Sequence, residues 1–198
     1  QLGLEIYGGA LFAPWFDREL SIAGRVAIAN GGSVLSELFD LRHPLGVIPS
    51  LAIHLDRDAN SGRKINPHDE LVMVIGRAES DAEFDFKKWL ADQMERSADE
   101  ISAFELCVYP VESATLAGLE NEFLLSARLD NLLSCCVSIE ALIENEHADG
   151  VMVVLNDHEE VGSVSTSGAD GPFLESVMRR ASVQADFEAV RANSLMIS

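Results

Sequence analysis

The sequence predicts an α/β protein whose first half is rich in β-structure, because the pattern of its apolar residues changes near residue 121. Before this position, strand-like runs are separated by glycine- and proline-containing turns, and there is little helical spacing. After it, apolar residues recur at helical spacing and alternate with one continuous apolar run. Such alternation of strand and helix is typical of a mostly parallel sheet covered by helices. We therefore expect two segments of different architecture.

The first half is predicted to open with a short strand and a hairpin. Residues 2–12 form an apolar run that Gly8 and Gly9 interrupt, which indicates a strand leading into a turn. Residues 25–41 contain two strand-like stretches around Asn30-Gly31-Gly32, and these residue types favour a tight hairpin turn. The other expectations for this half are irregular structure over 43–71, an apolar segment at 71–76, a helix within 84–96 and a strand at 103–111.

The second half is predicted to alternate strands and helices. Residues 123–131 resemble a strand that ends in Asp130, and the apolar residues of 132–145 recur at helical spacing. The continuous apolar run at 150–156 is typical of a strand buried on both faces of a parallel sheet. A last helix is expected over 171–181, beginning at Gly171 and Pro172.

Composition excludes several classes of partner. The chain has 14 Lys and Arg against 33 Asp and Glu, so its field should repel nucleic acid and anionic membranes. No apolar run approaches the 18 residues of a membrane-spanning helix. Three cysteines without a CxxC spacing indicate reduced thiols and a cytoplasmic protein. Because the chain begins with Gln and in strand-like sequence, we expect it to be a piece of a longer protein.

Three carboxylates are the candidate site. Asp130 ends one predicted strand, and Glu159 and Glu160 follow the next one. If these strands are neighbours, the three side chains meet in one cleft, because ligands gather at the carboxyl ends of strands in such sheets. One carboxylate of the pair could then bind metal while the other acts as a base, although an ordinary acidic turn is an alternative. His158 does not start a helical zinc motif, since Gly162 stands where the second His is needed.

Other apparent motifs are weaker. Residues 56–67 begin like a calcium-binding loop, but Ser61 and Pro67 occupy the positions of its glycine and its closing Glu. The apolar neighbours of His54 favour a core or interface histidine over a ligand. No nucleophile elbow surrounds the serines of 163–167, so a loop is expected there.

Four motifs together resemble the aspartyl aminopeptidase family of cocatalytic zinc exopeptidases. They are "YGGALFAPWFDRELSIAGRV", "VIPSLAIHLDRDAN", "SARLDNLLSC" and "NDHEEVGSVSTSGADGPFL", and they follow the family's order through nearly the whole chain. The resemblance implies part of a mixed-sheet α/β catalytic domain, interrupted by a β-rich dimerisation domain. The corresponding ranges are 1–12 for the edge of the catalytic domain, 13–120 for the dimerisation domain and 121–198 for the catalytic segment.

The resemblance also implies roles for four residues. Asp130 would bridge two divalent metal ions, expected to be zinc, and Glu160 would bind one of them. Glu159 would be the general base. His54 would be lent to the active site of a neighbouring subunit and bind substrate there. The family releases N-terminal Asp or Glu from peptides and forms homo-oligomers, which are dodecamers built from dimers.

Further expectations follow from what the resemblance implies. Other metal ligands of the family lie outside these 198 residues, so we expect the isolated chain to be inactive. The peptide bond between Asp130 and Asn131 is expected to be cis, as in related cocatalytic sites. A non-catalytic, acidic dimerisation module is the alternative function.

Overall fold

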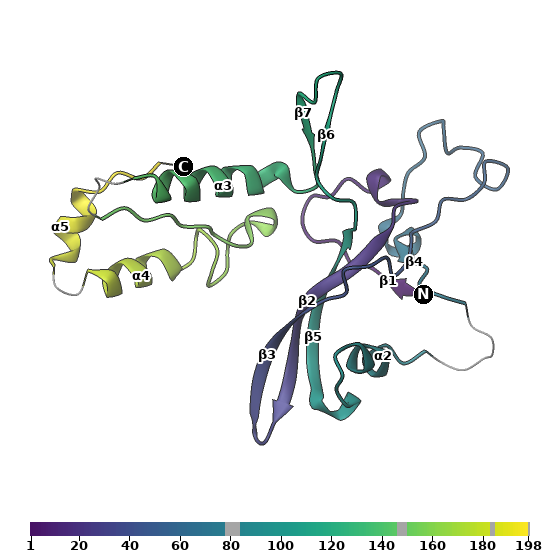
Figure 1. The fold of residues 1–198 in the computed structure, drawn as a ribbon, viewed down its shortest axis with the longest axis horizontal. Coiled ribbons are helices and arrows are strands. Elements are labelled where there is room, and N and C mark those ends of the chain that lie inside the picture. The colour runs from purple at the N-terminus through teal and green to yellow at the C-terminus, as the bar shows by residue number, and fades with distance from the viewer. Residues whose placement is uncertain (78–83, 146–149, 183–184, 198) are drawn as a thin grey trace. The chain divides into compact units, whose positions relative to one another are not determined.

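The computed structural model describes residues 1–77, 84–145, 150–182 and 185–197, and its chain forms two compact units. Unit 1 contains residues 1–6 and 11–127, and unit 2 contains residues 7–10 and 128–198 (Figure 1). This division follows contacts within the chain. The domain ranges expected from the resemblance therefore stay a prediction.

Unit 1 is built on antiparallel sheets. Its central sheet has the strand order β3-β2-β5, and β2 pairs with both neighbours in the antiparallel sense. Gly31 and Gly32 adopt positive φ between paired Asn30 and Ser33, which confirms the predicted hairpin. The elements are β1 (Leu2–Gly3), η1 (Ala13–Trp15), β2 (Leu20–Asn30), β3 (Ser33–Asp40), α1 (Pro67–Glu70), β4 (Val72–Met73), α2 (Phe86–Gln93), η2 (Ala98–Glu100), β5 (Ile101–Pro110), β6 (Thr115–Ala117) and β7 (Phe123–Leu125).

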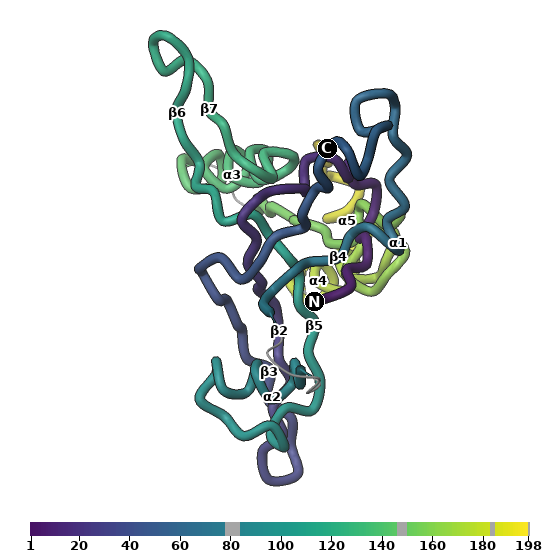
Figure 2. Tube along the Cα trace, turned by 90° about the vertical axis from the view of Figure 1, so that its right-hand side faces the viewer, coloured from purple at the N-terminus to yellow at the C-terminus, as the bar shows by residue number. Residues whose placement is uncertain are grey.

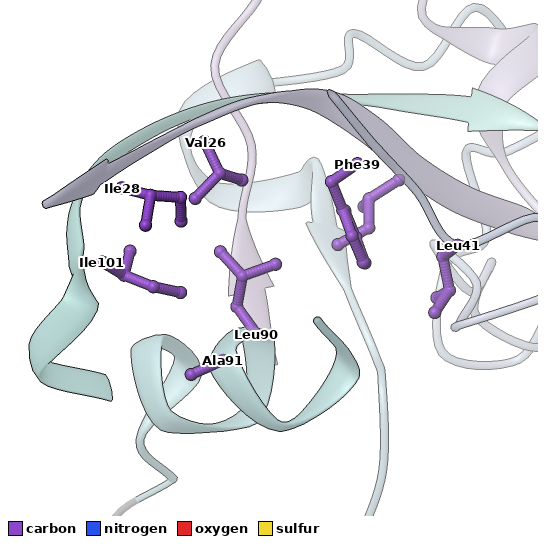
Figure 3. Packing of buried hydrophobic residues seen from close by; sticks show 8 residues of the cluster. Val26, Ile28, Phe39, Leu41, Leu90, Ala91 and Ile101 are labelled. Carbon is purple, nitrogen blue, oxygen red and sulfur yellow. The ribbon is translucent and has the colours of Figure 1, made fainter. Parts of the chain in front are cut away.

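The main core of unit 1 lies between the central sheet and α2. Alternate residues of β2 point to one face, and Val26 and Ile28 pack there against Leu90 of α2 and Ile101 of β5 (Figure 3). Asp85 caps the start of this helix, because its carboxylate accepts a hydrogen bond from the backbone N–H of Lys88 at 2.9 Å. The predicted helix within 84–96 and the strand at 103–111 are both confirmed.

Replacing Leu90 with Ala should lower the free energy of unfolding of unit 1 by about 2–5 kcal/mol, because it leaves a cavity in a fully buried position. Urea denaturation followed by Trp89 fluorescence measures the change. The matched control is Leu38→Ala on β3, whose side chain is 84% exposed and should change stability by less than about 0.5 kcal/mol. Equal losses for the two variants would contradict this assignment of the core.

A second core holds the irregular part of unit 1 together. Leu20, Ile48, Leu71 and Met73 are buried in it. Isolated bridges join residues 46–48 to β2 and to the region of β4. Figure 2 shows the path of the chain between β3 and α1, which contains these residues. The expected irregular structure over 43–71 is confirmed apart from the short helix α1. Backbone pairing of this kind gives the segment fixed geometry without regular strands.

The regular elements assigned among the described residues of unit 2 are all helices. Its elements are α3 (Leu129–Ile143), η3 (Glu159–Val161), α4 (Phe173–Ala181) and α5 (Phe187–Ala192). The helices predicted at 132–145 and 171–181 are confirmed. None of the described helices is long and apolar enough to cross a membrane.

The strand predicted at 150–156 is wrong for the described structure, in which residues 151–156 have no strand pairing. Val151, Met152 and Leu155 are about half exposed, at 47%, 46% and 51%. An apolar run becomes a buried strand only when neighbouring strands pair with its backbone, and no strand is assigned among the described residues of unit 2. The parallel sheet expected here is therefore not formed by the described part of the chain.

The expected strand ending at Asp130 is also corrected. Strand β7 ends at Leu125, and Asp130 lies in the first turn of α3 with the non-helical angles φ −84° and ψ 115°. The peptide bond between Asp130 and Asn131 is cis, which confirms the expectation drawn from the resemblance.

Candidate active site

Glu159 and Glu160 occupy a tight turn with exposed side chains. They begin the single turn η3, which is bounded by His158 and Gly162, both in the left-handed region at φ 61° and 96°. The backbone N–H of Gly162 donates to the carbonyl of Glu159 at 3.0 Å, and that of Ser163 donates to the carbonyl of His158 at 2.8 Å. This bent backbone lets two adjacent carboxylates leave the chain in directions that a regular strand would not allow.

The segment Tyr7–Ala10 belongs to the same unit as the glutamate pair. Gly8 has φ +69°, and a Cβ added there would lie 2.6 Å from the Cβ of Glu160 and 3.0 Å from its carbonyl oxygen. The ring of Tyr7 lies 6.5 Å from that of His158 between centroids. Only glycine fits at position 8, because any Cβ would collide with Glu160. The sequence alone indicated only that Gly8 and Gly9 end a strand.

Gly8→Ala should therefore disturb the candidate site. The added methyl group collides with Glu160, and the positive φ disfavours any residue with a Cβ. We expect a loss of about 1–3 kcal/mol in the stability of unit 2, measured by the protection of its amides against hydrogen exchange. Gly9→Ala is the control, because a Cβ at Gly9 meets nothing within 4 Å. Similar protection in both variants would show that the close approach is unimportant.

Asp130 is exposed near the start of α3. Its neighbour Asn131 accepts a hydrogen bond from the Sγ of Cys135 at 3.2 Å, one helical turn further on. Within the ranges that the structure describes, no three or more His, Cys, Asp or Glu side chains are grouped so that they could hold a metal ion. The structure brings Glu159 and Glu160 together, but it does not assemble them with Asp130 into the three-carboxylate cleft that the sequence suggested.

His54 lies in unit 1, in an exposed turn of the irregular segment. Its apolar neighbours Leu51 and Leu55 are 58% and 69% exposed, so His54 is not a core histidine of this chain, whereas the interface alternative stays a prediction. The turn is closed by the backbone N–H of Leu55, which donates to the carbonyl of Ala52 at 2.8 Å. An exposed imidazole in an apolar turn is open to a partner, and its role in a neighbouring subunit stays a prediction.

Side chains at both ends anchor the segment that carries His54. At its start, Asp17 accepts hydrogen bonds from Ser50, which hold the pKa of this carboxyl below its ordinary value. At its end, Arg63 forms ion pairs with Asp56, at 3.1 Å, and with Glu70, and it lies over the ring of Phe16. Asp56 thus pairs with an arginine, which agrees with the rejection of a calcium loop here. The sequence carried no signal for this pairing, because each partner looks like an ordinary surface charge.

Arg63→Met should loosen this segment and lower the stability of unit 1 by about 1–3 kcal/mol, because two partly buried carboxylates lose a charged hydrogen-bond donor. The side chains of Arg63, Asp56 and Glu70 are only 16–26% exposed. The control is Arg25→Met, since the pair of Arg25 with Glu105 is 66% and 77% exposed and should contribute at most about 1 kcal/mol. Thermal unfolding of the two variants tests the difference, and an equal or larger loss for Arg25→Met would contradict it.

Comparison with known proteins places the chain in a family. The family described as "Aminopeptidase I zinc metalloprotease (M18)" matches residues 1–198, which is the whole chain. The chain belongs to the M18 aminopeptidase family. A relative named "Probable M18 family aminopeptidase 2" from Azotobacter vinelandii is 48% identical over 203 residues, covering 100% of this chain and 47% of that protein. The M18 chain therefore spans about half the length of the curated relatives that it matches.

Solved M18 structures share the fold of this chain. One, titled "Cryo-EM structure of the Ape4 and Nbr1 complex", has a TM-score of 0.80 and 36% identity, covering 91% of this chain and 39% of that one. Another, the mApe1 dodecamer of S. cerevisiae, has a TM-score of 0.70 and 27% identity, covering 91% of this chain and 42% of that one. The mixed α/β structure described above thus corresponds to part of an M18 aminopeptidase.

The described residues of this M18 chain do not complete a zinc centre by themselves. Asp130 and Glu160 offer exposed carboxylate oxygens, which zinc accepts, but a catalytic zinc takes three protein ligands and leaves a fourth position open. No such group of three is present in the described ranges. Carboxylate oxygens are suitable ligands for zinc, but the described residues do not group the three ligands that a catalytic zinc needs.

Proposed function

We propose that these 198 residues are part of a longer, zinc-dependent aminopeptidase that releases N-terminal Asp or Glu from peptides. The observation that carries the proposal is the match to the M18 family over the whole chain. The exposed Glu159-Glu160 pair on its tight turn supports it. Relatives are about twice as long, so the complete protein has room for further metal ligands. The preference for acidic residues rests on the likeness of the motifs to aspartyl aminopeptidases.

In this proposal the two glutamates have different tasks. Glu160 and Asp130 would hold zinc through their carboxylates, together with ligands from the rest of the complete protein. Glu159 stays free of metal, takes a proton from the attacking water and delivers it to the leaving amine. The chemistry that zinc supplies when bound is polarisation of the scissile carbonyl and a lower pKa of that water. His54 contacts substrate in the active site of a neighbouring subunit.

We further propose a cytoplasmic homo-oligomer built from dimers, with a dodecamer as the complete assembly. The dodecameric structure of S. cerevisiae mApe1, a protein similar to this chain, supports the assembly. The three cysteines are free thiols, which suits a reducing compartment.

A non-catalytic assembly module is the second candidate. One contrast favours it: unit 1 has two buried cores, whereas the described ranges contain no group of three metal ligands. Under this proposal the chain contributes a folded surface to an oligomer, and the glutamate pair has no chemical role.

A peptide assay on the complete protein separates the two proposals. The substrates are four peptides that differ only in their N-terminal residue, which is Asp, Glu, Ala or Lys. We expect zinc-dependent release of Asp and Glu well above that of Ala and Lys, and loss of release when zinc is removed with a chelator. Absence of release from every peptide would favour the assembly module. Equal release of Ala and Asp would retain the aminopeptidase but contradict its acidic specificity.

A further inference from the structure

The imidazole of His158 closes the loop that carries the glutamate pair. Its Nδ1 atom lies 2.7 Å from the hydroxyl of Ser165, seven residues further along the chain. The same hydroxyl accepts a hydrogen bond from the backbone N–H of Gly168 at 3.0 Å. One side-chain contact therefore joins the residue before Glu159 to the far side of the loop.

The hydrogen bonds of this contact have a consistent direction. The hydroxyl of Ser165 accepts from Gly168 and still has its own hydrogen to donate. Because Nε2 of His158 faces the Asp157 carboxylate at 3.7 Å, we assign the imidazole hydrogen to Nε2, which leaves Nδ1 to accept from Ser165. Asp157 also accepts from the backbone N–H of His158 at 2.8 Å. Hydrogen bonds to Ser165 and Asp157 thus fix both the imidazole and the backbone of His158.

The backbone of the loop is folded tightly around Ser165. A Cβ added to Gly168 would collide with the carbonyl oxygen of Ser163, and one added to Gly171 would collide with that of Ser165. The backbone N–H of Asp157 donates to the carbonyl of Ser167 at 3.2 Å, which closes the other end. The glycines of this stretch allow close approach of the backbone, and Ser165 becomes the centre of the folded loop.

We propose that His158 and Ser165 are positioning residues for Glu159 and Glu160, an inference that rests on the proposed function. His158 has the left-handed φ of 61°, which is unfavourable for a residue with a side chain and sets the direction in which the next two residues leave. The bond to Ser165 holds His158 in this conformation. Since Nδ1 is engaged by Ser165, the role of His158 is to orient the carboxylates rather than to bind metal through that atom.

Two variants of the complete protein remove the bond in different ways. His158→Phe keeps a ring beside Tyr7 but loses the nitrogen, and Ser165→Ala loses the hydroxyl. Each should lower kcat by about 10–100-fold with little change in KM, because partners behind metal ligands typically have effects of this size. Combining them should cost little more than either alone, since both remove the same contact.

Conservative variants test positioning against general destabilisation. His158→Asn tolerates positive φ and keeps an acceptor for Ser165, and Ser165→Thr keeps the hydroxyl. Both should restore kcat toward the wild-type value. The control is Ser182→Ala, which removes a serine hydroxyl that donates to the carbonyl of Met178 at 2.6 Å, at the end of α4, and should leave kcat unchanged.

A measurement without turnover completes the test. In Ser165→Ala, hydrogen exchange at the amide of Gly168 should become faster, because this N–H loses its acceptor. Unchanged exchange and unchanged kcat in Ser165→Ala would overturn the inference, as would a failure of Ser165→Thr and His158→Asn to restore kcat. Glu159→Gln separates this result from a failure of the proposed function. If wild type is inactive, the proposed function fails, and if Glu159→Gln retains activity, the role of Glu159 as general base fails; the inference falls in either case.

Discussion

Glu159→Gln in the complete protein should lower kcat by about 10²–10⁴-fold, because Gln cannot take a proton from the attacking water. Gln has nearly the size of Glu, and the side chain of Glu159 is exposed, so the fold should be retained. Zinc content and KM should stay close to the wild-type values, since the proposal leaves Glu159 free of metal. Steady-state kinetics on an Asp-peptide, with zinc measured by atomic absorption on the same sample, provide the test.

The matched control for this variant is Glu175→Gln on α4. Glu175 is exposed and pairs with Arg179 at 2.7 Å, in an i,i+4 arrangement that contributes little to stability. Its replacement removes one carboxylate from the same unit and should leave turnover unchanged. Full activity in Glu159→Gln would contradict the proposed general base. If both variants kept the turnover and zinc content of wild type and differed only in oligomer assembly, the assembly module would be favoured.

Asp130→Ala should have the second large effect, the loss of zinc together with turnover. In the proposed site the carboxylate of Asp130 would hold zinc, and because a methyl group cannot do so, the affinity for zinc should fall. After dialysis against metal-free buffer, the variant should hold less zinc than wild type and release no Asp above background. Excess zinc should not restore the wild-type rate. Full zinc content with lost activity would place Asp130 outside the metal centre.

Local signals in the sequence predicted much of the fold. The Asn30-Gly31-Gly32 turn and its flanking strands depend on neighbouring residues, and the hairpin forms as expected. Helix α3 follows from the helical spacing of its apolar residues, and α4 follows from Gly171 and Pro172 at its start. Such elements are set largely by local sequence, so no long-range contact has to be known in advance.

The failures concern contacts between distant residues. The apolar run at 150–156 needs partner strands, and the described residues of unit 2 contain none, so its pattern alone could not determine its structure. The close approach of Gly8 to Glu160 joins residues that are far apart in the sequence, and nothing near Gly8 indicates it. For Asp130, the sequence placed the residue near a strand end, whereas the cis bond followed from the resemblance alone.

The candidate site was predictable only in part for the same reason. The two glutamates stood out by their position behind an apolar run and before a glycine-rich stretch. From the sequence, Ser165 was considered only as a possible nucleophile. Its contact with His158 forms only in the folded loop, so no local pattern predicts it. His54 was judged by its apolar neighbours, which turn out to be exposed along with it.

The proposed mechanism depends most on the separate tasks of the two glutamates, and a paired zinc measurement tests this directly. Glu159→Gln and Glu160→Gln are prepared in the complete protein under the same conditions, and zinc per subunit is determined for both. We expect Glu159→Gln to retain the zinc content of wild type and Glu160→Gln to lose about one ion per subunit, as a site loses affinity when a ligand is removed. Equal zinc content in the two variants, or loss of zinc from Glu159→Gln alone, would contradict the account.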